Sequence, residues 1–138
     1  MKTSVIASIF FLVLSNTITG QIPDSLKFKS IVPGDFLSTF QKEEGALLID
    51  VREPFEYRKS RLKRAVNIPS SGNMDLAADT INKDRSIFLY CTSGFRSKRV
   101  ARIFCAKGFS NVYSLDGGIV AWRKAGMTED KKRIRGRK

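Results

Sequence analysis

One cysteine of this chain is placed where its thiol can act as a nucleophile. Cys91 directly follows the apolar run 87–90, and a helical segment begins a few residues later at Phe95. Ligands of open α/β sheets bind at the carboxyl ends of strands, where backbone amides and the positive end of a helix dipole face the site. Such surroundings lower the pKa of a thiol. The position therefore predicts a thiolate nucleophile that needs no general base.

The residues after Cys91 fit an anion-binding loop better than a hydrophobic core. Gly94 permits a tight curl that a side chain would hinder, and Arg96 adds a permanent cation. Thr92 and Ser93 supply hydroxyl donors. A small buried hydrophobe is the alternative role for a free cysteine, but a glycine and an arginine at this spacing serve no purpose in a core.

The chain has no histidine, and this absence excludes several kinds of site. A Cys–His pair, a Ser–His triad and a His-ligated metal site are all impossible. Two cysteines form neither a four-ligand zinc site nor a disulfide scaffold. Cys105 is expected to pack on a helix face, too far from Cys91 for a disulfide without movement.

The elements that must position the loop alternate between strand and helix patterns. Strands are expected at 46–51, 65–68, 86–90 and 111–115. Helices are expected at 35–41, 54–59, 75–81, 95–107 and 118–125. Continuous apolar strands that alternate with helices predict an α/β fold with a mostly parallel sheet.

The first twenty residues have the layout of a secretory signal peptide. A lysine near the start precedes an apolar run from Val5 to Leu14, and polar residues lead to Gly20. The run is about half the length that a membrane span needs. We expect cleavage near Gly20 and export to a periplasmic or extracellular location, with no permanent membrane span. The alternative is a buried N-terminal helix or strand.

The remainder is expected to form one domain over residues 21–127, and a monomer is plausible for it. The formal charge of +12 favours anionic partners. Part of this charge lies in residues 128–138, which we expect to be a solvated, disordered basic tail. A nucleic-acid or membrane-surface role of this tail is the alternative, although no nucleic-acid partner is expected.

The pattern Cys-x-x-Gly-x-Arg-Ser resembles the active loop of the rhodanese family of sulfurtransferases. Three further segments are similar to that family, and they occur in its order: Leu47–Glu53, Ala65–Pro69 and Leu115–Gly126. One such segment would be weak support, whereas four in order are strong. The resemblance implies a rhodanese-like fold, with a sheet of about five mostly parallel strands and helices on both faces.

The resemblance also implies a reaction and a set of roles. Sulfane sulfur would move from a small anionic donor such as thiosulfate to Cys91, and then to a thiol or cyanide acceptor. Cys91 would carry the sulfur as a persulfide, so no cofactor is implied. Arg96 would bind the donor. The loop backbone would cradle the outer sulfur, and its residues are Thr92, Ser93, Gly94, Phe95 and Arg96.

Three other residues are expected to support the site without reacting. Asp50 and Arg52 would brace the loop from the end of a neighbouring strand, and Ser97 closes the motif. Four residues separate Cys91 from Arg96, whereas related phosphatases have five. The shorter ring suits a sulfur atom and makes phosphatase activity the weaker prediction.

One segment departs from the family pattern. Residues 60–65 read Ser-Arg-Leu-Lys-Arg-Ala where the family usually reads Gly-His-Ile-x-Gly-Ala. The basic side chains of this region either form a rim that steers anionic donors or are scattered solvated charges; they are Arg58, Lys59, Arg61, Lys63 and Arg64. The leading function is a thiosulfate-type sulfurtransferase. The alternative is a partner-dependent sulfur carrier or a non-catalytic docking module.

Overall fold

The computed structural model describes residues 27–132 of the chain. The expected signal peptide at residues 1–20 lies outside the described residues, and so does its expected cleavage point. The distal part of the basic tail, residues 133–138, also lies outside them. Among the helices of residues 27–132, none combines the length and the apolar character needed to cross a bilayer.

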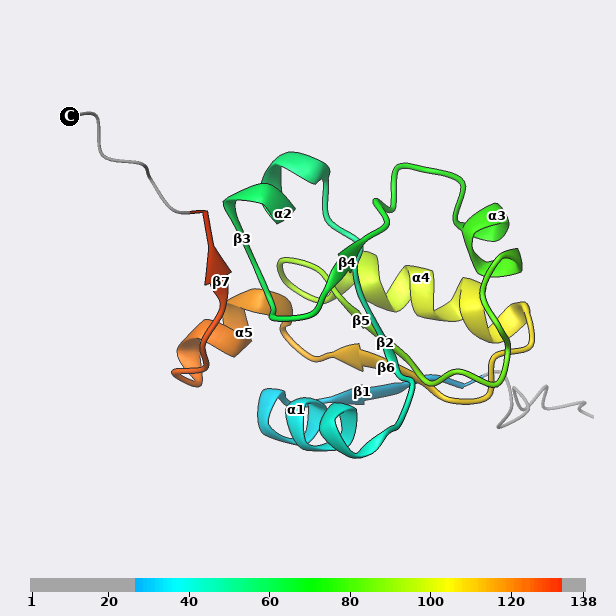
Figure 1. The fold of residues 1–138 in the computed structure, drawn as a ribbon, viewed down its shortest axis with the longest axis horizontal. Helices are drawn as coiled ribbons and strands as arrows, with labels where there is room; N and C mark the ends of the chain where they lie inside the picture. Colours follow the sequence, from blue (N-terminus) through cyan, green and yellow to red (C-terminus); the bar gives the residue numbers. More distant parts are fainter. Residues whose placement is uncertain (1–26, 133–138) are drawn as a thin grey trace, which may run out of the picture.

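A five-stranded sheet forms the centre of the fold (Figure 1). Its strand order is β1-β6-β5-β2-β4, and every neighbouring pair is parallel. The strands are β1 (Lys29–Ile31), β2 (Leu47–Asp50), β4 (Val66–Asn67), β5 (Ile87–Tyr90) and β6 (Val112–Leu115). This arrangement confirms the predicted parallel α/β sheet. It also places β5, which leads into Cys91, in the middle of the sheet.

Helices cover both faces of the sheet, as predicted. They are α1 (Pro33–Lys42), α2 (Pro54–Lys59), α3 (Met74–Asp79), α4 (Phe95–Ala106) and α5 (Gly118–Lys124). Their bounds agree with the sequence prediction to within two residues. Prolines at the first turns of α1 and α2 suit those positions, because a helix leaves these N–H groups unpaired in any case.

The apolar core is divided between the two faces of the sheet by the alternation of side chains along β5. Ile87 and Leu89 pack in the cluster that contains α3 and α4. Phe88 and Tyr90 point the other way, into the cluster that contains α1 and α5. Phe88 contacts Phe36 edge-on, with ring centroids 5.3 Å apart. Because all four β5 side chains are fully buried, each stabilises the fold by about 1.5 to 3 kcal/mol, and the strand is held rigidly beneath the loop.

A second, two-stranded sheet includes residues that lie beyond the predicted boundary at residue 127. β3 (Ser60–Arg61) pairs antiparallel with β7 (Asp130–Lys131), and the two strands lie beside α5 (Figure 1). The Trp122 indole donates a hydrogen bond of 2.9 Å to the Thr128 carbonyl. Backbone pairing and this hydrogen bond hold residues 128–132 against the domain, within the segment that the sequence analysis assigned to the tail.

Three short strands, β1, β3 and β7, were missed by the sequence analysis for a common reason. β1 is an edge strand of three residues with exposed or half-buried side chains, and β3 and β7 have two residues each. None is long enough to show a hydrophobic period. Their pairing partners lie 69 or more residues away in the chain, so only the tertiary fold brings them together.

Candidate functional site

The loop after β5 starts at the carboxyl edge of the sheet, as the sequence predicted. Tyr90 ends β5 in register with Asp50, which ends β2. Gly94 then precedes α4 with φ of 98°, a left-handed conformation that favours glycine. A side chain at Gly94 would press on the backbone of Gly117 and Leu115. Both the curl and the close packing therefore require glycine here.

The Cys91 sulfur lies inside this curl and contacts polar groups of the loop. The Gly94 amide donates a hydrogen bond to Sγ over 3.1 Å, and the Ser97 hydroxyl lies 3.6 Å from it. Ser97 is itself held by Ser114, with 2.9 Å between the two hydroxyl oxygens. The predicted supporting residue Ser97 thus contacts the sulfur directly, and Ser114 on β6 is a partner that the sequence did not indicate.

These contacts lower the pKa of Cys91 below that of an ordinary thiol. Burial is the largest influence and raises the pKa, because it disfavours the charged form. Hydrogen bonds to the thiolate from Ser97 and from the amides of Gly94 and Ser93 outweigh it. Cys105 provides a contrast, because burial without such donors raises its pKa. The net direction agrees with a thiolate nucleophile at Cys91.

The first turn of α5 shapes the loop from outside. The amides of Ile119 and Val120 donate to the carbonyls of Cys91 and Thr92, over 2.9 and 3.2 Å. This contact brings Gly118 so close that a Cβ there would fall on those two carbonyl oxygens. With the carbonyls turned toward α5, the loop amides are left to face the sulfur. Gly118 therefore begins α5 and also lies close against the Cys91 loop.

Arg96 lies at the mouth of the loop and is already bound to a carboxylate. Its guanidinium donates two hydrogen bonds to Glu56, of 2.8 and 3.0 Å, and one of 2.9 Å to the Thr92 hydroxyl. The hydrogen bonds to Glu56 raise the pKa of Arg96, and the nearby charge of Cys91 adds to this effect. The predicted anion-binding arginine is therefore adjacent to the sulfur but neutralised by Glu56.

Glu56 is the main site residue that the sequence analysis missed. Its hydrogen bonds with Arg96 lower the pKa of its carboxyl from 4.5 to about 2, although partial burial opposes the shift. Glu56 also closes a capping box with Glu53 at the start of α2. A capping-box pattern at 53–56 was the one available signal, and it indicates a helix start rather than a site.

Asp50 and Arg52, which were predicted to support the site, form a buried pair at the carboxyl edge of the sheet. Their buried ion pair has an N–O distance of 2.7 Å, and Arg52 also donates to the Ser60 carbonyl over 2.6 Å. The Tyr90 hydroxyl accepts a hydrogen bond of 3.0 Å from the Leu62 amide. Burial and the Asp50 charge raise the pKa of Tyr90, which keeps its hydroxyl neutral. This network joins β2, β5 and the segment after α2 without contacting the sulfur.

The remaining predicted loop residues differ in exposure. The Cys91 side chain is only 1% exposed, whereas Phe95 is 79% exposed and points away from the core. Thr92 is half-buried and donates to Glu56 over 2.9 Å. Cys91 and Cys105 are both free. Within residues 27–132, no group of three or more acidic or cysteine side chains is arranged to hold a metal ion.

The basic residues of the segment that departs from the family pattern are distributed over two different surfaces. Arg58 and Lys59 line a cleft that reaches Thr92, whereas Lys63 and Arg64 line another cavity near Phe40. Arg64 adopts φ of 70°, and no other non-glycine residue of 27–132 has a positive φ. Its guanidinium lies over the Phe40 ring, 5.1 Å from the centroid. The predicted basic rim therefore includes only part of this segment.

Comparison with known families agrees with this geometry. The profile of the family described as Rhodanese-like domain matches residues 33–125. The chain therefore belongs to the rhodanese-like domain family. The match contains the Cys91 loop, Leu47–Glu53 and Ala65–Pro69 in full, and the last segment up to Ala125.

Proteins similar in sequence to this chain differ from one another in length and in described activity. A sulfurtransferase of Allochromatium vinosum is 33% identical over 84 residues, which cover 61% of this chain and 78% of the relative. A tRNA uridine(34) hydroxylase of Hamiltonella defensa is 31% identical over 94 residues, 64% of this chain. The aligned part is only 26% of that hydroxylase. The family and the sulfurtransferase relative support sulfur transfer as the general chemistry of this domain.

Solved structures support the fold. The rhodanese-like domain of the Anabaena protein Alr3790 matches with a TM-score of 0.66 and 23% identity. The match covers 81% of this chain and 86% of the Anabaena domain. The five-stranded parallel sheet with helices on both faces is thus that of a rhodanese-like domain.

Proposed function

We propose that this protein is a sulfurtransferase that carries sulfane sulfur as a persulfide on Cys91 and accepts it from thiosulfate or a similar anionic donor. The observation that carries the proposal is the contact between the Cys91 sulfur and the Gly94 amide, 3.1 Å long, inside a loop that lowers the pKa of the thiol. A thiolate at this position is a nucleophile without a neighbouring base.

The proposed reaction has two displacement steps. The Cys91 thiolate attacks the outer sulfur of thiosulfate, the sulfur–sulfur bond of thiosulfate breaks, and sulfite leaves with the bonding electron pair. A nucleophilic acceptor then attacks the outer sulfur of the persulfide, and the Cys91 thiolate leaves. With cyanide as the acceptor, the product is thiocyanate. Amides of the loop stabilise the negative charge on the outer sulfur during both steps.

The test is thiosulfate-to-cyanide sulfur transfer by the purified protein, measured as thiocyanate. We expect turnover by the wild type and none by Cys91→Ser. Mass spectrometry after incubation with thiosulfate alone should find a single added sulfur on the peptide that contains Cys91. Turnover that survives in Cys91→Ser would contradict the proposal.

A partner-dependent sulfur carrier is the second candidate, and the closed site favours it. Cys91 is 1% exposed. Arg96, which would bind a free donor, is already hydrogen-bonded to Glu56. A protein donor that displaces Glu56 would open such a site on contact. Absence of turnover with small donors, together with transfer from a persulfidated protein, would favour the carrier over the free enzyme.

A role with tRNA is suggested by the relative named tRNA uridine(34) hydroxylase, of which this chain matches about a quarter. The net charge of +12 supports attraction to a polyanion. Salt-dependent retention of tRNA by the full chain, lost on deletion of residues 131–138, would support this role. Unchanged tRNA retention after the deletion would show that the basic tail does not bind tRNA.

We further propose that the protein is exported after cleavage near Gly20. The apolar run Val5–Leu14 between a basic start and polar residues supports this proposal. Mature protein from the producing cells should begin near Gln21. Soluble protein that retains Met1 and Lys2 would contradict export by this route.

A further inference from the structure

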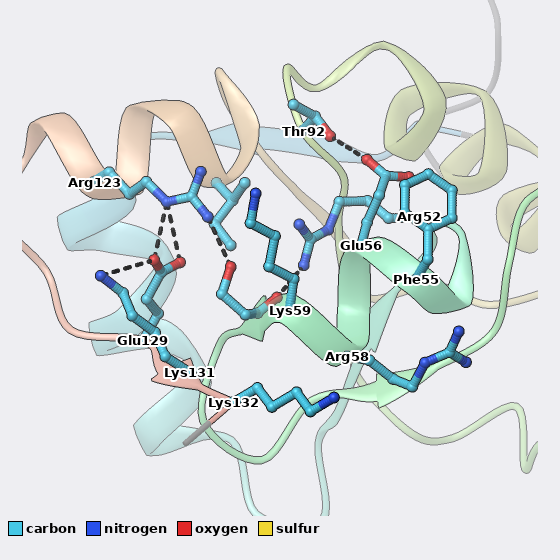
Figure 2. A pocket seen from close by; sticks show the side chains of 12 residues that line it. Arg52, Phe55, Glu56, Arg58, Lys59, Thr92, Arg123, Glu129, Lys131 and Lys132 are labelled. Atoms are coloured by element: carbon cyan, nitrogen blue, oxygen red, sulfur yellow. Dashed lines mark hydrogen bonds and ion pairs between the residues drawn. The ribbon is translucent and has the colours of Figure 1, made fainter. Parts of the chain in front are cut away.

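A basic cleft lies beside the active loop and is larger than a small inorganic donor requires. Its volume is about 860 Å³, and side chains of α2, β3, α5 and β7 line it together with Thr92 (Figure 2). Six of the lining side chains are basic: Arg52, Arg58, Lys59, Arg123, Lys131 and Lys132. Clefts of this size hold organic ligands of moderate size.

Most of the positive charge of the cleft is not neutralised by the protein. Arg52 is paired with Asp50, and the lining carboxylate of Glu56 is taken by Arg96. The other five basic side chains share one carboxylate, Glu129, which accepts from Arg123 over 3.0 Å.

Three of these five cations have no carboxylate partner in the described part of the chain: Arg58, Lys59 and Lys132. Like charges in a concave surface repel one another and concentrate the field. The cleft is therefore suited to a ligand with at least two negative charges.

The fold holds these cations in place from two distant segments. Pairing of Ser60 with Lys131 in the β3–β7 sheet joins the end of α2 to the C-terminal segment. The Lys132 amide donates to the Lys59 carbonyl over 3.1 Å, and Arg123 donates to the Ser60 hydroxyl over 2.8 Å. Figure 2 shows Lys59 extending over the cleft from α2, with Arg123 reaching in from α5. The charged wall is thus built by backbone pairing and is not a loose collection of surface lysines.

The cleft ends at the residue next to the nucleophile. Thr92 lines the cleft and directly follows Cys91. A ligand anchored by its negative groups among Lys59, Arg123 and Lys132 would extend toward the mouth of the loop. We infer that this cleft is the acceptor site, and that the sulfur acceptor is an organic thiol carrying two or more negative charges. The inference rests on the proposed sulfurtransferase function.

The transfer to such a thiol balances without an added oxidant or reductant. The acceptor thiolate attacks the outer sulfur of the Cys91 persulfide, and a new sulfur–sulfur bond forms on the acceptor. The bond between the two sulfurs of the persulfide breaks, and its electron pair remains on Cys91 as a thiolate. The acceptor leaves as a persulfide, and its anionic groups do not react. They raise the local concentration of the thiol at the loop.

Binding is tested first, without turnover, by calorimetric titration of the full chain with S-methylmercaptosuccinate, a dianion that cannot accept sulfur. The cleft variant Lys59→Gln/Lys132→Gln is compared with Lys63→Gln/Lys124→Gln, which removes the same charge outside the cleft. We expect the dissociation constant to rise about fivefold to tenfold in the cleft variant. In the matched control it should stay within about twofold, because distant surface charges are screened. Equal affinities in both variants and the wild type would overturn the inference.

Turnover then separates this inference from the proposed function. Persulfidated wild type should transfer sulfur to mercaptosuccinate with a higher kcat/KM than to uncharged 2-mercaptoethanol, and only the cleft variant should lose this preference. Normal thiosulfate-to-cyanide turnover without the preference would overturn the acceptor site alone. Absence of turnover even to cyanide would count against the sulfurtransferase itself. Binding of tRNA, but not of the dianion, that depends on Lys59 and Lys132 would also overturn the inference in favour of an RNA site.

Discussion

Short hydrogen bonds, and not a neighbouring base, lower the pKa of the Cys91 thiol. Burial alone would raise its pKa, as it does for Cys105. Donors at Gly94 and Ser97 reverse that direction because they are aimed at the sulfur. The reactivity of Cys91 should therefore depend on Ser97 more than on any charged side chain of the loop.

The first prediction concerns the pH profile of Cys91. Its alkylation by iodoacetamide, followed by mass spectrometry, should have a midpoint below the value of about 8.5 for a free cysteine. Reactivity should be retained above the lowered pKa and lost as the pH falls through it. Ser97→Ala should move the midpoint upward, because it removes a side-chain hydrogen bond that lowers the pKa of Cys91. Ser93→Ala keeps the backbone amide and serves as control; equal midpoints in both variants would contradict this account.

A second prediction follows from the ion pair between Glu56 and Arg96. Glu56→Gln removes the charge that competes with an anionic donor but keeps the size of the side chain. We expect the KM for thiosulfate to fall about threefold to fivefold. The donor then no longer has to break the ion pair of Arg96, which stabilises the unliganded site by about 1 kcal/mol. Steady-state kinetics beside the control Glu44→Gln, an exposed glutamate outside the site, would measure it. An unchanged or higher KM would show that Glu56 does not compete with the donor.

The same pair predicts how stability depends on acid. The pKa of Glu56 is lowered in the folded protein from 4.5 to about 2, so its ion pair stabilises the fold above pH 4.5. The contribution is lost as the pH falls through about 2. Urea unfolding should find Glu56→Gln less stable than the wild type by about 1 to 2 kcal/mol at pH 7. The difference should shrink toward pH 2; a difference independent of pH would be inconsistent with the ion pair.

At the scale of elements, α5 and the Cys91 loop constrain each other through one glycine, Gly118. Gly118 has φ of 60°, and a Cβ added to it would fall on the carbonyl oxygens of Cys91 and Thr92. Any side chain there would push α5 away from the loop. The loop would then lose the two amide hydrogen bonds from Ile119 and Val120 that turn its carbonyls outward.

A fourth prediction compares two glycines with similar backbone angles. Gly118→Ala should destabilise the protein by about 2 to 4 kcal/mol, since it combines a left-handed alanine with a backbone clash. Gly126→Ala, with φ of 71° and open space around the added carbon, should cost only about 1 to 2 kcal/mol. Thermal unfolding and thiosulfate turnover would be measured together. Equal effects of the two substitutions would rule out the clash as the cause.

At the scale of the whole molecule, the C-terminal segment completes the cleft but not the core. β7 pairs with β3, Thr128 accepts from Trp122, and Glu129 accepts from Arg123. The residues that hold Cys91 belong to the five-stranded sheet and its helices. The segment should therefore contribute to acceptor binding and moderately to stability, and little to the reactivity of Cys91.

A fifth prediction tests this division by truncation. Removing residues 128–138 should lower the free energy of unfolding by about 1 to 3 kcal/mol, from the lost hydrogen bonds and the exposed face of Trp122. Turnover to cyanide should persist, whereas the preference for a dianionic thiol should disappear. Removing residues 133–138 alone separates the contribution of β7 from that of the distal basic residues. Loss of cyanide turnover on removal of β7 would place the segment in the reaction itself.

Much of the fold was predictable because long buried elements leave a strong pattern. Two continuous apolar strands, β2 and β5, and the long helix α4 were all anticipated. β1, β3 and β7 were not, since short exposed strands are stabilised by a partner and not by their own residues. Glu56 escaped prediction for a related reason, because only folding brings α2 to Arg96, 40 residues further on.

The sequence by itself determined the parallel α/β fold and predicted Cys91 and its loop as the candidate site, because local spacing and buried apolar runs carry that information. Only the tertiary structure decided that Arg96 is held by Glu56 and that residues 128–132 pack on the domain. It also decided which basic residues share a cleft: Lys59 and Lys132 do, and Lys63 does not. These features depend on contacts between distant segments, whose geometry arises only when the sheet and its helices pack.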